Sequence, residues 1–96
     1  MILEIATFSI KTDQLAEFEG AFIEAHKIIT QANGCGSAKL QRSLENPGRY
    51  VLFVEWQTVA HHMEGFRNSP LFVQWRALLG PYFAATPSVE HFEVVS

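Results

Sequence analysis

The eight residues Arg49–Trp56 constrain the fold more than any other part of this sequence. They are rich in β-branched and aromatic residues, which favour a β-strand, and successive side chains of a strand point to opposite faces of a sheet. Apolar residues fall on both faces: Tyr50, Leu52, Val54 and Trp56 on one, Val51 and Phe53 on the other. Both faces must therefore be covered, and helices in so short a chain can cover only one.

The composition leads to the same expectation of a partner. Of the 96 residues, 48% are hydrophobic and only 18% are charged. A single domain of this size buries only roughly 60–65% of the surface of its unfolded chain. We therefore expect one domain over residues 1–96, which pairs with a second copy through the uncovered face of its sheet.

The pattern of apolar residues predicts the order strand, helix, strand, strand, broken helix, strand. The predicted strands are Ile2–Ile10, Gly36–Glu45, Arg49–Trp56 and Ser88–Val95. A strand–helix–strand connection is right-handed in nearly all proteins, and two such units interleaved give the ferredoxin-like plaque. The sequence therefore predicts an α+β fold of βαββαβ order, with a four-stranded antiparallel sheet and helices on one face.

Turn and capping residues mark the ends of these elements. Thr12 or Asp13 could cap the first helix, whose apolar face is Leu15, Phe18, Phe22, Ala25, Ile29 and Ala32. Asn33-Gly34 predicts a left-handed stop after it, and Asn46-Pro47-Gly48 predicts the turn before Arg49. Ser69-Pro70 predicts a restart of the broken helix, with serine as the N-cap and proline at the first helical position.

The charges, the lengths of the apolar runs and the cysteine count each exclude a class of partner or site. The net charge is −3, and the seven Lys and Arg residues are scattered, so we expect no nucleic acid partner. No apolar run reaches membrane-spanning length, and the first residues lack the pattern of a signal peptide. Cys35 is the only cysteine, which excludes an internal disulfide, and we expect a cytoplasmic protein.

His62 is the most unusual residue of the predicted second helix. It shares one helical face with Val59, Met63 and Phe66, at positions where the pattern calls for apolar side chains. An imidazole there either satisfies its nitrogens with buried partners, as core histidines usually do, or faces a cavity.

Aromatic residues gather around this position in the chain. They are Trp56, Phe66, Phe72, Trp75, Tyr82 and Phe83. Rings at helical spacing are more often ordinary core than a binding site. Two Trp, two Tyr and eight Phe are nevertheless enough to line a flat apolar pocket for a small aromatic molecule.

Metal and phosphate sites have no support in the sequence. His26, His62 and His91 do not follow a recognised metal-ligand spacing, and Cys35 alone cannot build a cysteine-based zinc site. The six glycines are dispersed, so there is no glycine-rich phosphate loop. We expect neither a metal nor another cofactor.

Residues 56–72 (WQTVAHHMEGFRNSPLF) resemble the antibiotic biosynthesis monooxygenase family, and with the element order the resemblance covers essentially the whole chain. It implies a dimeric α+β barrel with a pocket between helices and sheet. Similar members oxidise polycyclic phenols or anthrones to quinones with O₂ and without flavin, haem or metal. On this chain the resemblance makes His62 the base or the hydrogen-bond partner of the substrate, with Trp56, Phe66, Trp75 and Phe83 as walls.

Some family members degrade haem, and this chain departs from their pattern. They use an Asn in the first strand, a Trp in the second helix and a His in the third. Thr7 or Phe8, Phe66 and Trp75 stand at those places here. We therefore do not expect haem degradation. The family resemblance, with His62 on an otherwise apolar face, makes our leading hypothesis a cofactor-independent monooxygenase that acts on a small aromatic or quinone-like substrate.

Two other functions stay open at this point. One is a dimer that binds a small molecule, or is purely structural, without turnover. The other is an isomerase or lyase, for which Glu55 and Arg67 are the only charged candidates near the predicted pocket.

Overall fold

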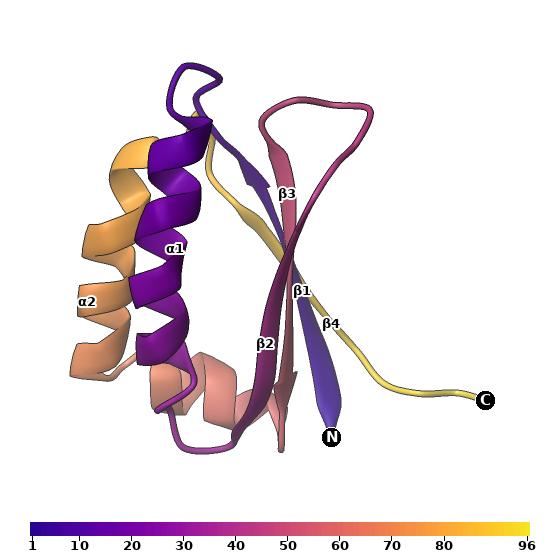
Figure 1. Cartoon of the computed structure of the whole chain (residues 1–96). Coiled ribbons are helices and arrows are strands. Elements are labelled where there is room, and N and C mark those ends of the chain that lie inside the picture. The colour runs from indigo at the N-terminus through magenta and orange to yellow at the C-terminus, as the bar shows by residue number, and fades with distance from the viewer.

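The computed structural model describes all residues, 1–96, and consists of a four-stranded sheet with helices on one side (Figure 1). The elements in chain order are β1 (Ile2–Ser9), α1 (Leu15–Ile29), β2 (Cys35–Arg42), β3 (Arg49–Trp56), the π-helical segment η1 (His61–Phe66), α2 (Pro70–Leu79), the 3₁₀ turn η2 (Gly80–Tyr82) and β4 (Ser88–Phe92). No helix is long and apolar enough to cross a membrane.

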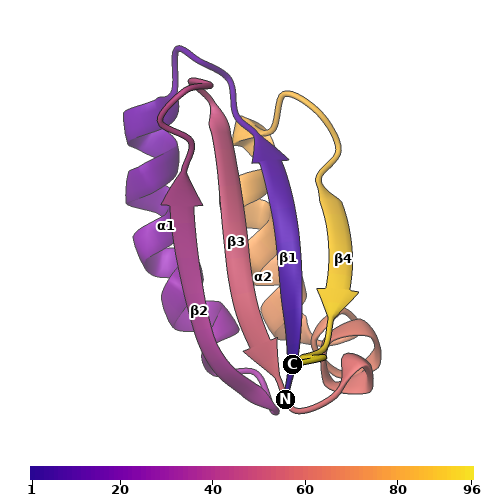
Figure 2. The ribbon, with the colours of Figure 1, turned by 90° about the vertical axis from the view of Figure 1, so that its right-hand side faces the viewer.

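The sheet has the strand order β2-β3-β1-β4, and every neighbouring pair is antiparallel. Figure 2 shows the four strands in front and both long helices behind them. The order βαββαβ, with all helices on one face, confirms the predicted ferredoxin-like α+β fold.

β3 has the two-faced character that the sequence predicts. Leu52, Val54 and Trp56 are completely buried beneath the helices, and Tyr50 is 2% exposed. The opposite face of the sheet carries no helix (Figure 1) and presents a set of half-buried or exposed apolar side chains. From the register of the strands this set, called here the open face, comprises Leu3, Ile5, Val51, Phe53 and Phe92.

Capping of α1 differs from the prediction. The N-cap is Gln14 and makes no side-chain cap bond, so neither Thr12 nor Asp13 has that role. The backbone N–H of Gln14 bonds to the carbonyl of Lys11 at 2.9 Å, and this turn places the N-cap one residue after Asp13 and two after Thr12. The apolar face is as predicted, because Phe18, Phe22, Ala25 and Ile29 are buried.

The second helix is wound differently from the predicted α-helix. In η1 the backbone N–H of Arg67 bonds to the carbonyl of His62 at 3.0 Å, an i→i+5 pattern. The wider turn buries only His62 and Phe66, whereas Val59 and Met63 are 42% and 41% exposed. The predicted apolar face with four members is therefore wrong for those two residues.

Three strands end earlier than predicted, β1 by one residue at Ser9 and β2 and β4 by three residues each. β2 ends at Arg42 rather than Glu45, and β4 ends at Phe92 rather than Val95. Val94 and Val95 are 86% and 95% exposed, because β4 is an edge strand and its pairing with β1 stops at Leu3. Ser69 is the N-cap of α2 with Pro70 at the first helical position, as the sequence predicts.

Gly48 fixes the turn between β2 and β3. Its φ is +86°, a region that L-residues with a side chain rarely adopt, and a Cβ there would lie 2.7 Å from the carbonyl oxygen of Ile10. The carbonyl of Gly48 in turn accepts a 2.7 Å hydrogen bond from the backbone N–H of Ile10. The turn thus ties the start of β3 to the end of β1.

We expect Gly48→Ala to destabilise the protein by roughly 1–3 kcal/mol, from backbone strain and the clash with Ile10. Gly20→Ala is the matched control, because Gly20 lies within α1 and a Cβ there meets nothing within 4 Å. That change should stabilise the fold by roughly 0.5–1 kcal/mol. Urea unfolding monitored by circular dichroism measures both, and equal effects of the two changes would contradict this account of the turn.

Candidate functional site

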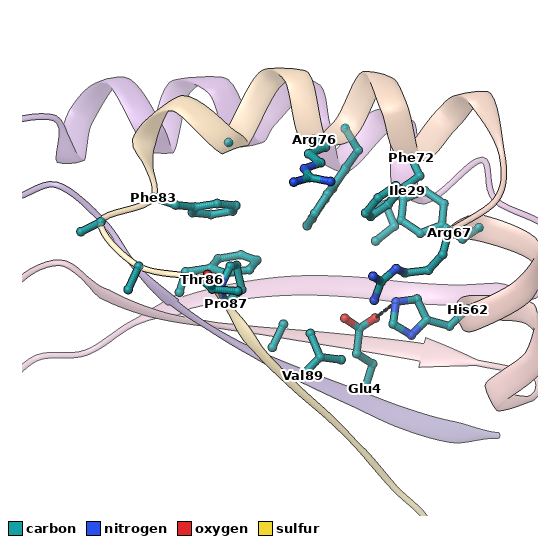
Figure 3. A pocket seen from close by; sticks show the side chains of 17 residues that line it. Glu4, Ile29, His62, Arg67, Phe72, Arg76, Phe83, Thr86, Pro87 and Val89 are labelled. Atoms are coloured by element: carbon teal, nitrogen blue, oxygen red, sulfur yellow. Dashed lines mark ion pairs between the residues drawn. The ribbon is translucent and has the colours of Figure 1, made fainter.

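A cavity of about 470 Å³ lies between α2 and the sheet, within the size range of small-molecule sites (Figure 3). β1 and β4 contribute its floor, α2 its roof, and the segment after α2 one end. Seventeen residues line it: Glu4, Ala6, Phe8, Ile29, His62, Phe66, Arg67, Phe72, Trp75, Arg76, Gly80, Phe83, Ala84, Ala85, Thr86, Pro87 and Val89.

Aromatic rings form much of the wall. Phe66 meets Phe72 edge to face with ring centroids 5.4 Å apart, and Phe72 stacks on Trp75 at 6.2 Å. At the other end Phe8 and Phe83 lie 5.1 Å apart. Such contacts fix the rings in place, so the cavity offers a rigid apolar surface to a planar molecule.

Glu4 places a carboxylate in the cavity wall. It belongs to the face of β1 that also carries Ala6 and Phe8, and it is only 4% exposed. Its Oε1 accepts a 2.9 Å hydrogen bond from the indole Nε1 of Trp56 and lies 3.4 Å from Nε2 of His62. Figure 3 shows the second carboxylate oxygen directed into the cavity.

His62 is held between rings and polar atoms. Its imidazole stacks on Trp56 with centroids 5.1 Å apart and planes 18° apart, and it is 4% exposed. Its Nδ1 lies 2.8 Å from Nε2 of His91 in β4. With the proton on Nε2 of His62, which faces Glu4, Nδ1 accepts a hydrogen bond from Nε2 of His91.

Their surroundings shift the pKa values of Glu4 and His62 in opposite directions. Burial lowers the pKa of His62 to about 4, and the charges of His91 and Arg67 act in the same sense. Burial raises the pKa of Glu4, although the hydrogen bond from Trp56 and the charge of Arg67 oppose the change. Burial thus makes the carboxylate of Glu4 more basic than usual and the imidazole of His62 less basic than usual.

Two arginines are the only cationic groups that line the cavity at neutral pH. Arg67 follows η1, and its guanidinium lies 5.3 Å from the centroid of the Phe72 ring. Arg76 belongs to α2, and Figure 3 shows its side chain directed from the helix toward the cavity. The ion pairs of the chain at neutral pH are Lys27–Glu24 and Arg42–Glu19, so neither cavity arginine is paired with a carboxylate.

The structure places most of the predicted site residues around one space. His62, Phe66, Phe72, Trp75 and Phe83 all line the cavity.

Trp56 and Tyr82 do not line it. Trp56 is completely buried behind His62, where its indole supports Glu4 instead of forming a wall. Tyr82 turns toward α1, where its ring lies 6.2 Å from that of Phe18.

Other candidates from the sequence lie elsewhere. Nε2 of His26 lies 2.9 Å from the carbonyl oxygen of Ala38, in contact with β2. Glu55 belongs to the opposite side of the sheet and accepts a 2.7 Å hydrogen bond from Ser37. No three His, Cys, Asp or Glu side chains are grouped so that they could hold a metal ion.

The sequence reasoning missed Glu4, Arg76 and the contact of His91 with His62. A signal for Glu4 existed in the alternation of β1, where it shares a face with Ala6 and Phe8 and thus predicts a buried acid. His91 and Arg76 carried no such signal, because their roles depend on how β4 and α2 meet η1.

A four-stranded ferredoxin-like sheet with an aromatic-walled cavity beneath its helices defines the structural class of this protein. Within that class the sequence of residues 1–78 matches the model of the antibiotic biosynthesis monooxygenase family. The chain belongs to this family.

Two relatives are similar over almost the whole chain. A solved structure from Bordetella bronchiseptica, assigned to the same monooxygenase family, is 41% identical, with a TM-score of 0.95 over 99% of this chain and 97% of that one. The uncharacterized protein YczJ of Bacillus subtilis is 40% identical over 99% of this chain and all of its own length.

More distant structures share the fold. SnoaB, a cofactor-independent oxygenase from Streptomyces nogalater, is 18% identical, with a TM-score of 0.79 over 99% of this chain and 93% of that one.

The lowered pKa of His62 predicts a loss of stability in weak acid. The folded protein keeps His62 neutral down to about pH 4, whereas the unfolded chain binds a proton near pH 6.5. The free energy of unfolding therefore decreases as the pH falls through this window, by about 2 kcal/mol between pH 7 and pH 5. Comparison of urea unfolding at both pH values with that of His62→Gln isolates this contribution, because the variant should lack it.

His61→Gln is the control, because His61 is the neighbouring histidine and contacts Thr58 rather than the cavity. It should keep the full pH dependence of the wild type. A wild-type profile that matches that of His62→Gln would show that His62 is not held neutral in the folded protein.

Proposed function

We propose that the protein is a cofactor-independent monooxygenase that oxidises a small phenolic or quinone-forming aromatic molecule with O₂. The observation that carries this proposal is the carboxylate of Glu4, which is aimed into an aromatic-walled cavity and braced by His62 and Trp56. Membership of the monooxygenase family and the shared fold of SnoaB, a cofactor-independent oxygenase, support it.

The first step is removal of the phenolic proton by Glu4. A phenolate is electron-rich and can give one electron to O₂, which yields superoxide and a phenoxyl radical. His62 stays neutral, and its Nε2 lies 3.4 Å from the carboxylate, which it helps to orient. Arg67 lines the same end of the cavity, where its charge would stabilise the phenolate. A substrate packed against the aromatic walls would displace water, which otherwise weakens each of these interactions.

The remaining steps balance without an external reductant. Superoxide and the phenoxyl radical combine at a ring carbon to give a peroxide, and cleavage of its O–O bond leaves one oxygen as a carbonyl. The other oxygen leaves as water, with the proton held by Glu4 and the hydrogen lost from the ring carbon. The sum is a phenol plus O₂ to a quinone plus H₂O, so the substrate supplies every electron.

We expect Glu4→Gln to reduce kcat by roughly 10²–10⁴-fold, because the amide keeps the shape of the side chain but cannot accept the proton. His62→Gln should reduce kcat less, because His62 orients the carboxylate of Glu4 but does not receive the proton. The measurement is oxygen uptake with a panel of phenols, naphthols and anthrones.

Glu55→Gln is the matched control, because Glu55 lies on the other side of the sheet, and it should retain full turnover. Turnover in Glu4→Gln equal to that of the wild type would remove Glu4 from the mechanism. Binding of aromatic ligands without oxygen uptake by the wild type would favour the alternative, a binding dimer without turnover.

The open face supports a second part of the proposal, a homodimer in which two sheets meet face to face. Leu3, Ile5, Val51, Phe53 and Phe92 are apolar side chains on a face that no element of the chain covers, with Lys39, Glu55 and Glu90 beside them. A second copy would cover it with the same residues, as two-fold interfaces do. The resemblance to dimeric α+β barrels supports the same arrangement.

Phe53→Glu should convert the dimer to a monomer at micromolar concentration, because it places a charge in the middle of the open face. Val73→Glu is the control, since Val73 is 68% exposed on α2, on the opposite side of the molecule. Sedimentation equilibrium distinguishes the species. A wild-type protein that sediments as a folded single subunit would overturn the proposed assembly.

A further inference from the structure

The charges that line the cavity are unbalanced. Glu4 is the only acidic residue among the seventeen lining residues, whereas Arg67 and Arg76 are both cationic. His62 is neutral at pH 7, because its pKa is about 4. The cavity therefore carries a net positive charge, in a chain whose overall net charge is −3.

The two arginines occupy different parts of the cavity. Arg67 lies on the same side as Glu4 and His62 in Figure 3, and its charge affects the titration of both groups. Arg76 comes from the middle of α2 and lies between the positions of Phe83 and Phe72 in the same view. Arg67 thus belongs to the end of the cavity that holds Glu4 and His62, here called the reacting end, and Arg76 lies away from that end.

No protein group uses the charge of Arg76. It makes no ion pair and donates no hydrogen bond within the chain, and it is an exposed residue at the edge of the cavity. A guanidinium beside a cavity presents a planar fork of N–H donors that matches a carboxylate in two parallel hydrogen bonds. It is therefore a recognition element without a protein partner.

We propose that the molecule bound in this cavity is an aromatic acid whose carboxylate pairs with Arg76 while its phenolic oxygen faces Glu4. The inference rests on the proposed function, because it assigns the substrate class of the same site. One carboxylate neutralises the net charge of the cavity. With its carboxylate held at Arg76, the molecule places its phenolic hydroxyl beside Glu4 and His62. Its own carboxylate then stays away from the carboxylate of Glu4.

Two probes that differ only in charge test this inference. They are 6-hydroxy-2-naphthoate and 6-hydroxy-2-naphthamide, which have the same ring and hydroxyl and nearly the same shape. At pH 7.5 we expect the wild type to bind the acid about ten-fold more tightly than the amide, measured by isothermal titration calorimetry.

Arg76→Gln should remove most of this preference, by weakening acid binding about three- to ten-fold while amide binding stays within two-fold. Arg76→Lys keeps the charge but loses the planar fork, so its preference should lie between the two. Arg49→Gln is the matched control, because Arg49 lies at the start of β3 outside the cavity, and it should retain the wild-type preference.

Equal affinity of the wild type for acid and amide would overturn the inference. So would an Arg76→Gln variant that weakens both ligands equally while its circular dichroism spectrum is unchanged. Oxygen uptake separates this result from the proposed function. Charge-selective binding without oxygen consumption would support the carboxylate site and contradict the proposed monooxygenase activity. Oxygen consumption with equal kcat/KM for neutral and acidic phenols would support the activity and contradict the carboxylate site.

Discussion

A buried carboxylate on β1 is the constraint on which the site depends. An ionised group inside a protein is unfavourable unless other groups satisfy it, and Glu4 is only 4% exposed. The indole N–H of Trp56 and the imidazole of His62 supply those partners, and each of them is fixed in turn by the stacking of its ring on the other. Three separate elements, β1, β3 and η1, are thereby held at one point.

The irregular winding of η1 is what allows this arrangement. Its i→i+5 hydrogen bonds bring His62 over Trp56 and leave Arg67 at the edge of the cavity, before Ser69 and Pro70 start a new helix. The segment thereby places polar groups at one end of the cavity, as π-helical turns often do at functional sites.

Much of the fold could be predicted because it depends on local patterns. The two-faced β3, the apolar stripe of α1 and the Ser69-Pro70 restart each specify an element by themselves. The site was less predictable, because its chemistry comes from pairs far apart in the chain. Glu4 and Trp56 are 52 residues apart, and His62 and His91 are 29 apart. Only the tertiary fold shows that His62 titrates as part of a cluster and that Trp56 supports Glu4 from behind.

β1 separates assembly from chemistry by simple alternation. Glu4, Ala6 and Phe8 face the cavity, whereas Leu3 and Ile5 face the opposite side of the same strand. A partner that covers the open face therefore stiffens β1, which carries the proposed base, without blocking the cavity on the other side. Oxidation by O₂ without a cofactor depends on a fixed, dry arrangement of base and substrate. In this fold the proposed dimer supports that arrangement by packing against the back of the strand that holds Glu4.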